Sequence, residues 1–70
     1  MKDIEERKIL SRKLVAARED CKMTQAMVAE TGVLVQSELS KIENAERSVS
    51  FITVCKLAKL YNKPLTYFEI

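Results

Sequence analysis

Two short helical patterns lie on either side of the only glycine in the chain, and this arrangement restricts the fold more than any other feature of the sequence. Residues 24–44 read TQAMVAETGVLVQSELSKIEN. The hydroxyl of Thr24 can cap a first helix, and Gly32 can end it with a backbone conformation that most residues disfavour. The apolar residues that follow again have helical spacing. We therefore predict two closely packed short helices, at residues 24–32 and 36–43.

A longer helical pattern precedes these residues, and another follows them. The first covers residues 4–19. Asp3, just before it, followed by Glu6, resembles a capping box. Ser50 can cap the other helix, which comes after a loop at residues 44–50. The side chains expected to point inward from this helix are Phe51, Val54, Cys55, Leu57, Ala58 and Tyr61.

Pro64 indicates one more short helix near the C-terminus, because proline fits a first turn, where no amide hydrogen is needed. Leu65 and Phe68 can then cover the bottom of the bundle. Seventy residues make one small domain, and the sequence has neither strand-like alternation nor an internal repeat. We predict a single all-α domain over residues 1–70, folded as a compact five-helix bundle.

The composition favours a soluble globular protein and argues against catalysis. Hydrophobic residues make up 47% of the chain, but no apolar run approaches the ~20 residues of a membrane span. The charged N-terminus lacks the apolar core of a secretion signal, so we expect a cytoplasmic location. Without histidine, a glycine-rich phosphate loop or an activated nucleophile, we expect no enzyme activity, metal, cofactor or small-molecule ligand. Cys21 and Cys55 are expected to pack as small apolar groups.

The charges are too evenly mixed to form a dense basic patch. The net charge is +2, and residues 21–50 carry three basic and four acidic side chains. Leu39 and Ile42 mark the inner side of the second short helix. Its outer side then carries Gln36, Ser37, Ser40 and Lys41. Such a stretch is ordinary solvated surface when taken alone, so any contact with nucleic acid must depend on geometry and side-chain type.

A family resemblance runs through nearly the whole chain. It is carried by Arg18, by TQ at 24 and 25, by VAE at 28–30, by SELSKIEN at 37–44 and by KLAKLYNKPLTYF at 56–68. Their order and spacing resemble the helix-turn-helix domain of the phage Cro and repressor type, also called Cro/C1-type or XRE family. The resemblance implies the lambda-repressor-like fold. The small size resembles restriction-modification controller proteins and small phage repressors.

This resemblance implies a function for the two short helices. Residues 24–32 would be the positioning helix and residues 36–43 the recognition helix, whose N-terminal side chains enter the major groove of DNA. The residues implied to read bases are Gln36, Ser37, Ser40 and Lys41. Those implied to contact the DNA backbone are Gln25, Asn44 and Arg47. For Arg47 the resemblance also implies contact with bases at the groove edge.

The resemblance also implies a structural ion pair. Arg18 and Glu43 stand where the family pairs an arginine of the first helix with a glutamate at the end of the recognition helix. The pair would be partly buried and would orient the recognition helix. Removal of either partner would leave a charge without compensation.

Some residues depart from the family pattern. Val35 replaces the usual serine or threonine cap of the recognition helix, and Ala45 replaces a glycine that follows it. Glu38 and Glu46 place acids on or near the expected DNA side. Phosphates repel a carboxylate there, although a carboxylate can accept a hydrogen bond from a cytosine amino group.

Two functions of different class fit these observations. In the first, the chain is a sequence-specific transcriptional regulator, a repressor, that reads a palindromic double-stranded DNA operator as a homodimer. The dimer would use Leu65, Tyr67, Phe68 or Ile70. In the second, the fold serves as a protein-protein interaction module or antitoxin-like partner with weak DNA binding, through exposed Met27 and the apolar tail. Undetectable binding to any duplex would favour the second function.

Overall fold

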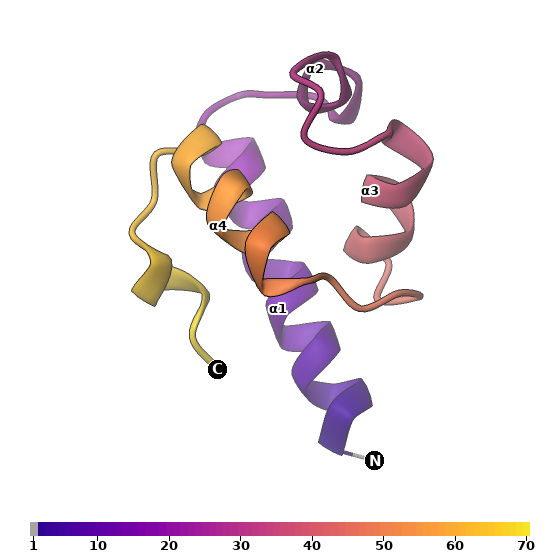
Figure 1. Cartoon of the computed structure of the whole chain (residues 1–70). Coiled ribbons are helices and arrows are strands. Elements are labelled where there is room, and N and C mark those ends of the chain that lie inside the picture. The colour runs from indigo at the N-terminus through magenta and orange to yellow at the C-terminus, as the bar shows by residue number, and fades with distance from the viewer. Residues whose placement is uncertain (1) are drawn as a thin grey trace.

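The computed structural model describes residues 2–70, with side chains from Asp3 onward, as a bundle of helices (Figure 1). The elements are α1 (Lys2–Asp20), α2 (Gln25–Glu30), α3 (Gln36–Glu43), α4 (Phe51–Leu60) and η1 (Leu65–Phe68), a turn of 3-10 helix. No strand occurs within these residues, and none of their helices is long and apolar enough to cross a membrane. The predicted all-α bundle is confirmed, with a 3-10 turn as its fifth helix.

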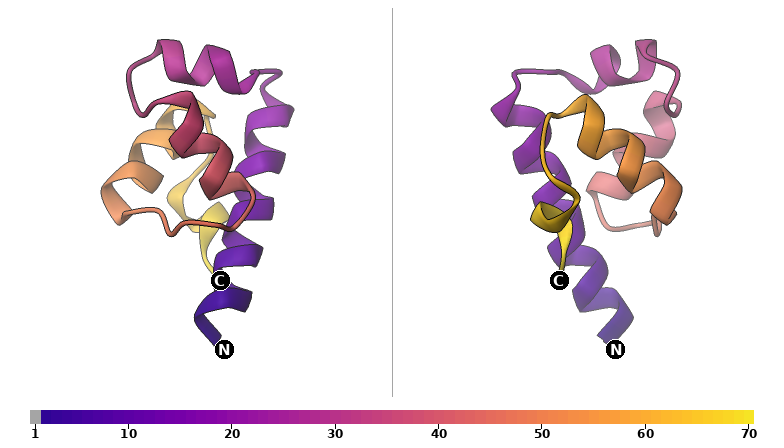
Figure 2. Two further views of the ribbon diagram at one scale, coloured as in Figure 1. Left: turned by 90° about the vertical axis from the view of Figure 1, so that its right-hand side faces the viewer. Right: turned by 60° about the vertical axis from the view of Figure 1, so that its left-hand side comes forward.

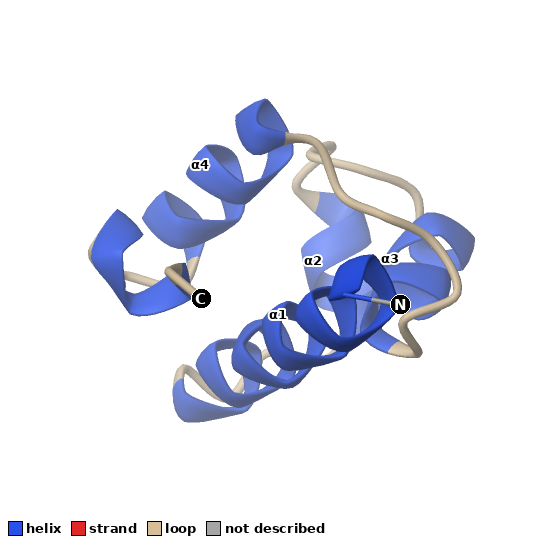
Figure 3. Ribbon diagram, turned by 90° about the horizontal axis from the view of Figure 1, so that it is seen from below, coloured by secondary structure: helices blue, strands red, loops and turns tan. Residues whose placement is uncertain are grey.

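α1 is the longest helix, and it lies between two pairs of shorter elements. α2 and α3 pack against each other on one side of the molecule, and α4 and η1 do so on the other (Figures 1 and 3). Both α3 and η1 contact α1. The first turns of α1 extend beyond the bundle, at the end opposite α2 (Figure 2). α3 is therefore held by α1 and α2, and its remaining side is free to face outward.

The core draws its side chains from every element. Its members are Leu14, Ala17, Val28, Leu39, Ile42, Val54, Leu57, Ala58, Tyr61 and Phe68. α4 contributes three of them at spacings of three and four residues, as the sequence pattern predicts for a helix with one buried face. The largest fully buried side chain is Tyr61, directly after α4.

The prediction that Phe51 points into the core is wrong. Its exposed fraction is 69%, the largest among the exposed apolar side chains of residues 3–70. Phe51 is the first residue of α4 and lies one turn before buried Val54, so it stands past the edge of the core, where the loop enters the helix. Cys55 is only partly buried, as is Cys21, and both are free thiols.

Side-chain hydroxyls cap two helices as predicted. The amide of Met27 donates to the hydroxyl of Thr24 over 3.1 Å, and the amide of Thr53 donates to the hydroxyl of Ser50 over 3.1 Å. The capping box predicted at Asp3 is wrong, because α1 begins at Lys2 and Asp3 lies inside its first turn. An acid there still interacts favourably with the helix dipole.

Two other helix boundaries also differ from the predictions. α2 ends at Glu30 and not at residue 32, because the amides of Thr31 and Gly32 bond to carbonyls only three residues earlier. Gly32 has φ of +84°, so the glycine takes the left-handed conformation that the turn requires. Pro64 lies just before η1 and not within its first turn.

Three helices end at a left-handed residue that is not glycine. The φ angle is 60° at Lys22, 60° at Ala45 and 59° at Asn62. After each, an amide donates to the carbonyl five residues earlier, which satisfies a group that the helix end leaves free. These bonds join Met23 to Arg18, Glu46 to Lys41 and Lys63 to Ala58. Ala45 adopts a conformation that only glycine takes without strain, because the methyl group of alanine is disfavoured there.

A buried serine links α1 to α3. The hydroxyl of Ser11 donates a hydrogen bond of 2.6 Å to the carbonyl of Ile42, and Ser11 is only 4% exposed. The same carbonyl also accepts the amide of Ala45 over 3.1 Å, so the serine adds a second bond that ties the C-terminal end of α3 to α1. No pattern in the sequence points to Ser11, because a lone serine on a helix carries no signal of a contact 31 residues away.

Candidate nucleic-acid interface

One side of α3 is buried and the opposite side is exposed. Leu39 is fully buried and Ile42 is 4% exposed, against α1 and α2. On the opposite side, Ser37, Lys41 and Asn44 follow one another at spacings of four and three residues, and all three are exposed. This spacing places them in one row along the helix. The row is therefore available to a partner without any change in packing.

The other predicted base-reading residues lie beside this row. Gln36 is exposed and starts α3, whereas Ser40 is half-buried. Val35 precedes them as the N-cap and makes no side-chain capping bond. The structure thus brings Gln36, Ser37 and Lys41 to one accessible surface, with Ser40 at its margin.

Arg18 and Glu43 form a bidentate ion pair beneath this surface. Arg18 Nε lies 2.8 Å from Glu43 Oε2, and Arg18 Nη2 lies 3.0 Å from Glu43 Oε1. Their side chains are 13% and 5% exposed. Arg18 Nη1 also donates to the carbonyl of Met23 over 2.8 Å. The hydrogen bond with Glu43 raises the pKa of Arg18, so the guanidinium stays charged.

Gln25 adds α2 to this contact. Its side-chain amide donates a hydrogen bond of 2.9 Å to Glu43 Oε1, so side chains from α1 and α2 meet on the last residue of α3. The bond connects residues 18 positions apart, and no local sequence pattern predicted it. Gln25 is half-buried at the start of α2. Its contact with the DNA backbone stays a prediction.

Tyr61 is a core residue whose hydroxyl is affected by the charges of Glu43 and Arg18. It is 1% exposed, and within the described residues its hydroxyl has no hydrogen-bond partner. Burial raises the pKa of Tyr61 to about 12, and the negative charge of Glu43 adds to the shift. The phenol therefore stays neutral well above physiological pH.

A second ion pair lies at the surface beside the row. Arg47, in the loop after α3, donates from Nη1 to Glu38 Oε2 over 2.6 Å. The two side chains are 54% and 35% exposed. The acid on the expected DNA side is thus paired with the cation that was predicted to contact DNA. Asn44, also predicted to contact the DNA backbone, is exposed at the end of α3.

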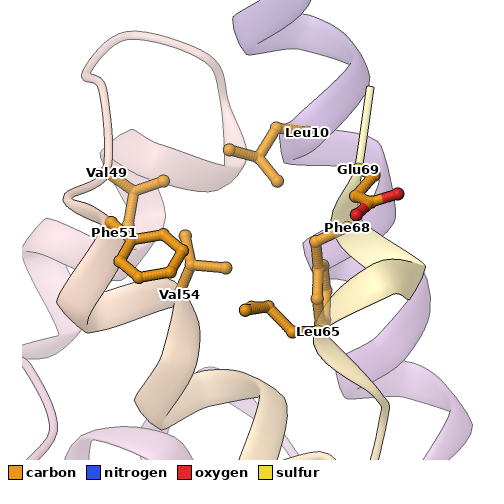
Figure 4. Close-up of a pocket in the computed structure, with 7 residues that line it drawn as sticks. All are labelled: Leu10, Val49, Phe51, Val54, Leu65, Phe68 and Glu69. Carbon is orange, nitrogen blue, oxygen red and sulfur yellow. The ribbon is translucent and has the colours of Figure 1, made fainter.

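An apolar groove opens elsewhere, between α1, the start of α4 and η1 (Figure 4). It has a volume of about 340 Å³. We call it the Phe51 groove, and its lining consists of Leu10, Val49, Phe51, Val54, Leu65, Phe68 and Glu69.

The four predicted interface residues differ in how far their side chains are exposed. Leu65 and Ile70 are exposed. Phe68 is 5% exposed and packs within its own chain, where the ring of Tyr67 meets it edge-on. Phe68 therefore offers little surface to a second copy, whereas Leu65 and Ile70 remain accessible.

The described residues contain no cluster of metal-ligating side chains. A comparison with family models matched residues 14–68 to a model described as helix-turn-helix. This match includes part of α1 and all of the remaining elements. No curated protein and no solved structure was significantly similar to the chain. The match covers well over half of the sequence. The chain therefore belongs to the Cro/C1-type (XRE) family of helix-turn-helix proteins, whose members are DNA-binding regulators.

Proposed function

We propose that the chain is a transcriptional regulator that binds double-stranded DNA in a sequence-specific manner, with α3 in the major groove. The observation that carries this proposal is the exposed row of Ser37, Lys41 and Asn44 on a helix whose other side is buried. A major groove admits one α-helix and displays a different donor and acceptor pattern for each base pair. Polar side chains in a row can read such a pattern.

The proposed contacts fall into two classes. Gln36 and Lys41 meet base edges, with Ser37 and Ser40 beside them, and these contacts specify the sequence. Gln25 and Asn44 contact the DNA backbone, and these contacts fix the position of the domain on the duplex. Arg47 lies at the groove edge, where it can contact the backbone or a base. Lys41 lies one turn beyond Ser37 on the exposed row, which suits a helix that enters the groove by its N-terminal end.

Readout of this kind requires a rigidly oriented helix, and the contacts of α3 supply one. Glu43 accepts bonds from both Arg18 and Gln25, and the carbonyl of Ile42 accepts from Ser11. These bonds fix the C-terminal end of α3 to the two helices beside it. A base contact depends on positions to within a fraction of an ångström, so this fixation supports specificity.

We further propose that the chain acts as a C2 homodimer that reads a palindromic operator and represses transcription by blocking polymerase. Two α3 helices spaced by one turn of DNA, about 34 Å, would read the two half-sites. The Phe51 groove supports a second copy as its occupant, because Phe51 both lines the groove and protrudes from it. In a two-fold interface the same surface of both copies is in contact, so a protruding side chain beside a groove can insert into the groove of the other copy.

Selection of bound sequences from a random duplex pool tests this function. We expect enrichment of one palindrome, and an affinity for it that falls steeply as the salt concentration rises, because bound phosphates release counterions. Failure to enrich any sequence, with undetectable binding to all duplexes at low salt, would overturn the proposal. The protein-binding function would then be the better account, with the Phe51 groove and half-exposed Met27 as its surface.

A further inference from the structure

The ion pair between Glu38 and Arg47 is a surface feature with free hydrogen-bonding capacity. Arg47 Nη1 donates one of its two N–H groups to Glu38 Oε2 over 2.6 Å. Within residues 2–70, neither side chain makes another hydrogen bond with a side chain or the backbone. The second N–H of Nη1, the N–H groups of Nη2 and a lone pair of Oε2 remain for an external partner.

The pair lies at the margin of the proposed DNA-reading surface. Glu38 is the third residue of α3, next to Ser37 and within the half of the helix that enters a groove. Arg47 reaches it from the loop that follows α3. The pair therefore presents donors and an acceptor side by side, at the edge of the row formed by Ser37, Lys41 and Asn44.

The order of these groups matches one base pair. The major-groove edge of a G·C pair presents two acceptors, guanine N7 and O6, followed by a donor, the cytosine amino group N4. Arg47 Nη2 and Nη1 are two donors, and Glu38 Oε2 beside them is an acceptor. Guanine O6 and cytosine N4 are hydrogen-bonded to each other, so they lie about 2.9 Å apart. The 2.6 Å between Nη1 and Oε2 fits that spacing.

We infer that Glu38 and Arg47 act together as a specificity determinant that reads a single G·C pair in each half-site. This inference rests on the proposed DNA-binding function and deepens it. Arg47 donates to guanine N7 and O6, while Glu38 accepts from cytosine N4, and the ion pair stays intact. Because the pair has no net charge, Glu38 meets the DNA without the repulsion that an unpaired carboxylate would suffer.

The same array rejects the other base pairs. An A·T pair presents the adenine amino group and thymine O4 where guanine O6 and cytosine N4 would lie, so donor would face donor and acceptor would face acceptor. A G·C pair in the reverse orientation likewise places its amino group against an arginine donor. A T·A pair keeps an acceptor, thymine O4, and a donor, the adenine amino group, at these two positions, so it is disfavoured only because the thymine methyl group replaces guanine N7. The array thus specifies both the identity and the orientation of the base pair.

The test compares the wild type with Glu38→Ala, which removes the acceptor, on the selected duplex and on the three single-base variants at each position. Glu46→Ala is the matched control, because it removes the same charge from an exposed residue in the neighbouring loop. We expect wild type to discriminate against every replacement of one G·C pair by about 5-fold to 150-fold, and Glu38→Ala to lose most of the discrimination against A·T and against the reversed G·C pair. Glu46→Ala should raise the affinity for all duplexes by the same factor and keep the discrimination.

A double-variant cycle with Arg47→Ala checks that the two residues read one base pair together. If they do, the double variant should lose about as much discrimination at that position as either single variant. Thermal melts should show all variants folded, since an exposed ion pair adds little to stability.

The possible outcomes separate this inference from the proposed function. If Glu38→Ala changes affinity for all duplexes alike, as Glu46→Ala does, the inference fails while DNA binding stands. Losses that add and fall on two different base pairs would also overturn it. If the wild type selects no duplex, the proposed function fails, and the inference fails with it.

Discussion

The side-chain amide of Gln25 and the carboxylate of Glu43 are joined by a hydrogen bond of 2.9 Å, which ties the first residue of α2 to the last residue of α3. Because Arg18 of α1 binds the same carboxylate, a single side chain fixes the angle between three helices. The turn at Gly32 alone could not do so, since it holds α2 and α3 at only one end. The contact at Glu43 holds them at the other.

Replacement of Glu43 by Gln should lower the melting temperature. Arg18 would keep its bond to the Met23 carbonyl but lose its counter-charge, and a buried pair broken in this way costs up to about 3–5 kcal/mol. We expect less here, because Arg18 is partly exposed. Each 1 kcal/mol shifts the midpoint by about 4–8 °C in a domain of this size. Thermal denaturation followed by circular dichroism measures the shift, and an unchanged midpoint would contradict the structural role.

Replacement of Tyr61 by Phe should weaken the pH dependence of stability in alkali. Burial raises the pKa of Tyr61 from 10.0 to about 12 in the folded chain. Folding therefore favours the neutral phenol, and this stabilisation is complete below pH 10 and lost as the pH rises to about 12. The melting temperature of the variant should fall less than that of wild type across this window.

At neutral pH, the same variant should be at least as stable as the wild type, because it removes a buried hydroxyl that has no partner. Melting temperatures of both proteins at neutral pH, and across the window from pH 10 to about 12, provide the comparison. If the melting temperatures of both proteins fell equally with pH, Tyr61 would not be responsible for the loss of stability in alkali.

Alanine substitutions should distinguish base readers from phosphate contacts. Gln36→Ala and Lys41→Ala should each cost about 1–3 kcal/mol of affinity for the selected site and relax the preference at one base pair. Asn44→Ala should weaken binding to all sequences alike. Anisotropy titrations against the selected site and its single-base variants, at two salt concentrations, make the distinction. If Gln36→Ala and Lys41→Ala both kept full affinity and full base preference, the assignment of α3 as the recognition helix would be refuted.

Replacement of Phe51 by Ser should reduce self-association without unfolding the chain, because the side chain is 69% exposed and contributes little to the core. Ile52→Ser is the matched control, since Ile52 is 66% exposed on the next residue but does not line the groove. Sedimentation equilibrium at tens of micromolar should give a dimer for wild type and for Ile52→Ser, and a monomer for Phe51→Ser. A monomeric wild type would rule out the proposed dimer at these concentrations.

Local patterns in the sequence predicted the elements well, and long-range contacts poorly. Helical spacing and the Ser50 cap placed the starts of α3 and α4 correctly, because both signals act within one or two turns. Periodicity also assigned Phe51 to the core, since it gives the face of a residue but not where the core ends. The Arg18–Glu43 contact was suggested only by the family resemblance. The bonds from Ser11 and Gln25 cross between helices, and the sequence contains no local trace of them.

The division of α3 into a packed side and an exposed side has an evolutionary consequence. Leu39, Ile42 and Glu43 carry the contacts that hold the helix, whereas Ser37, Lys41 and Asn44 take no part in the core. Mutations in the second group can therefore accumulate without loss of folding, because surface substitutions change stability by only about 0.5 kcal/mol. A duplicated gene for such a chain could acquire a new operator in a few single-codon steps, while both copies continue to produce a stable protein.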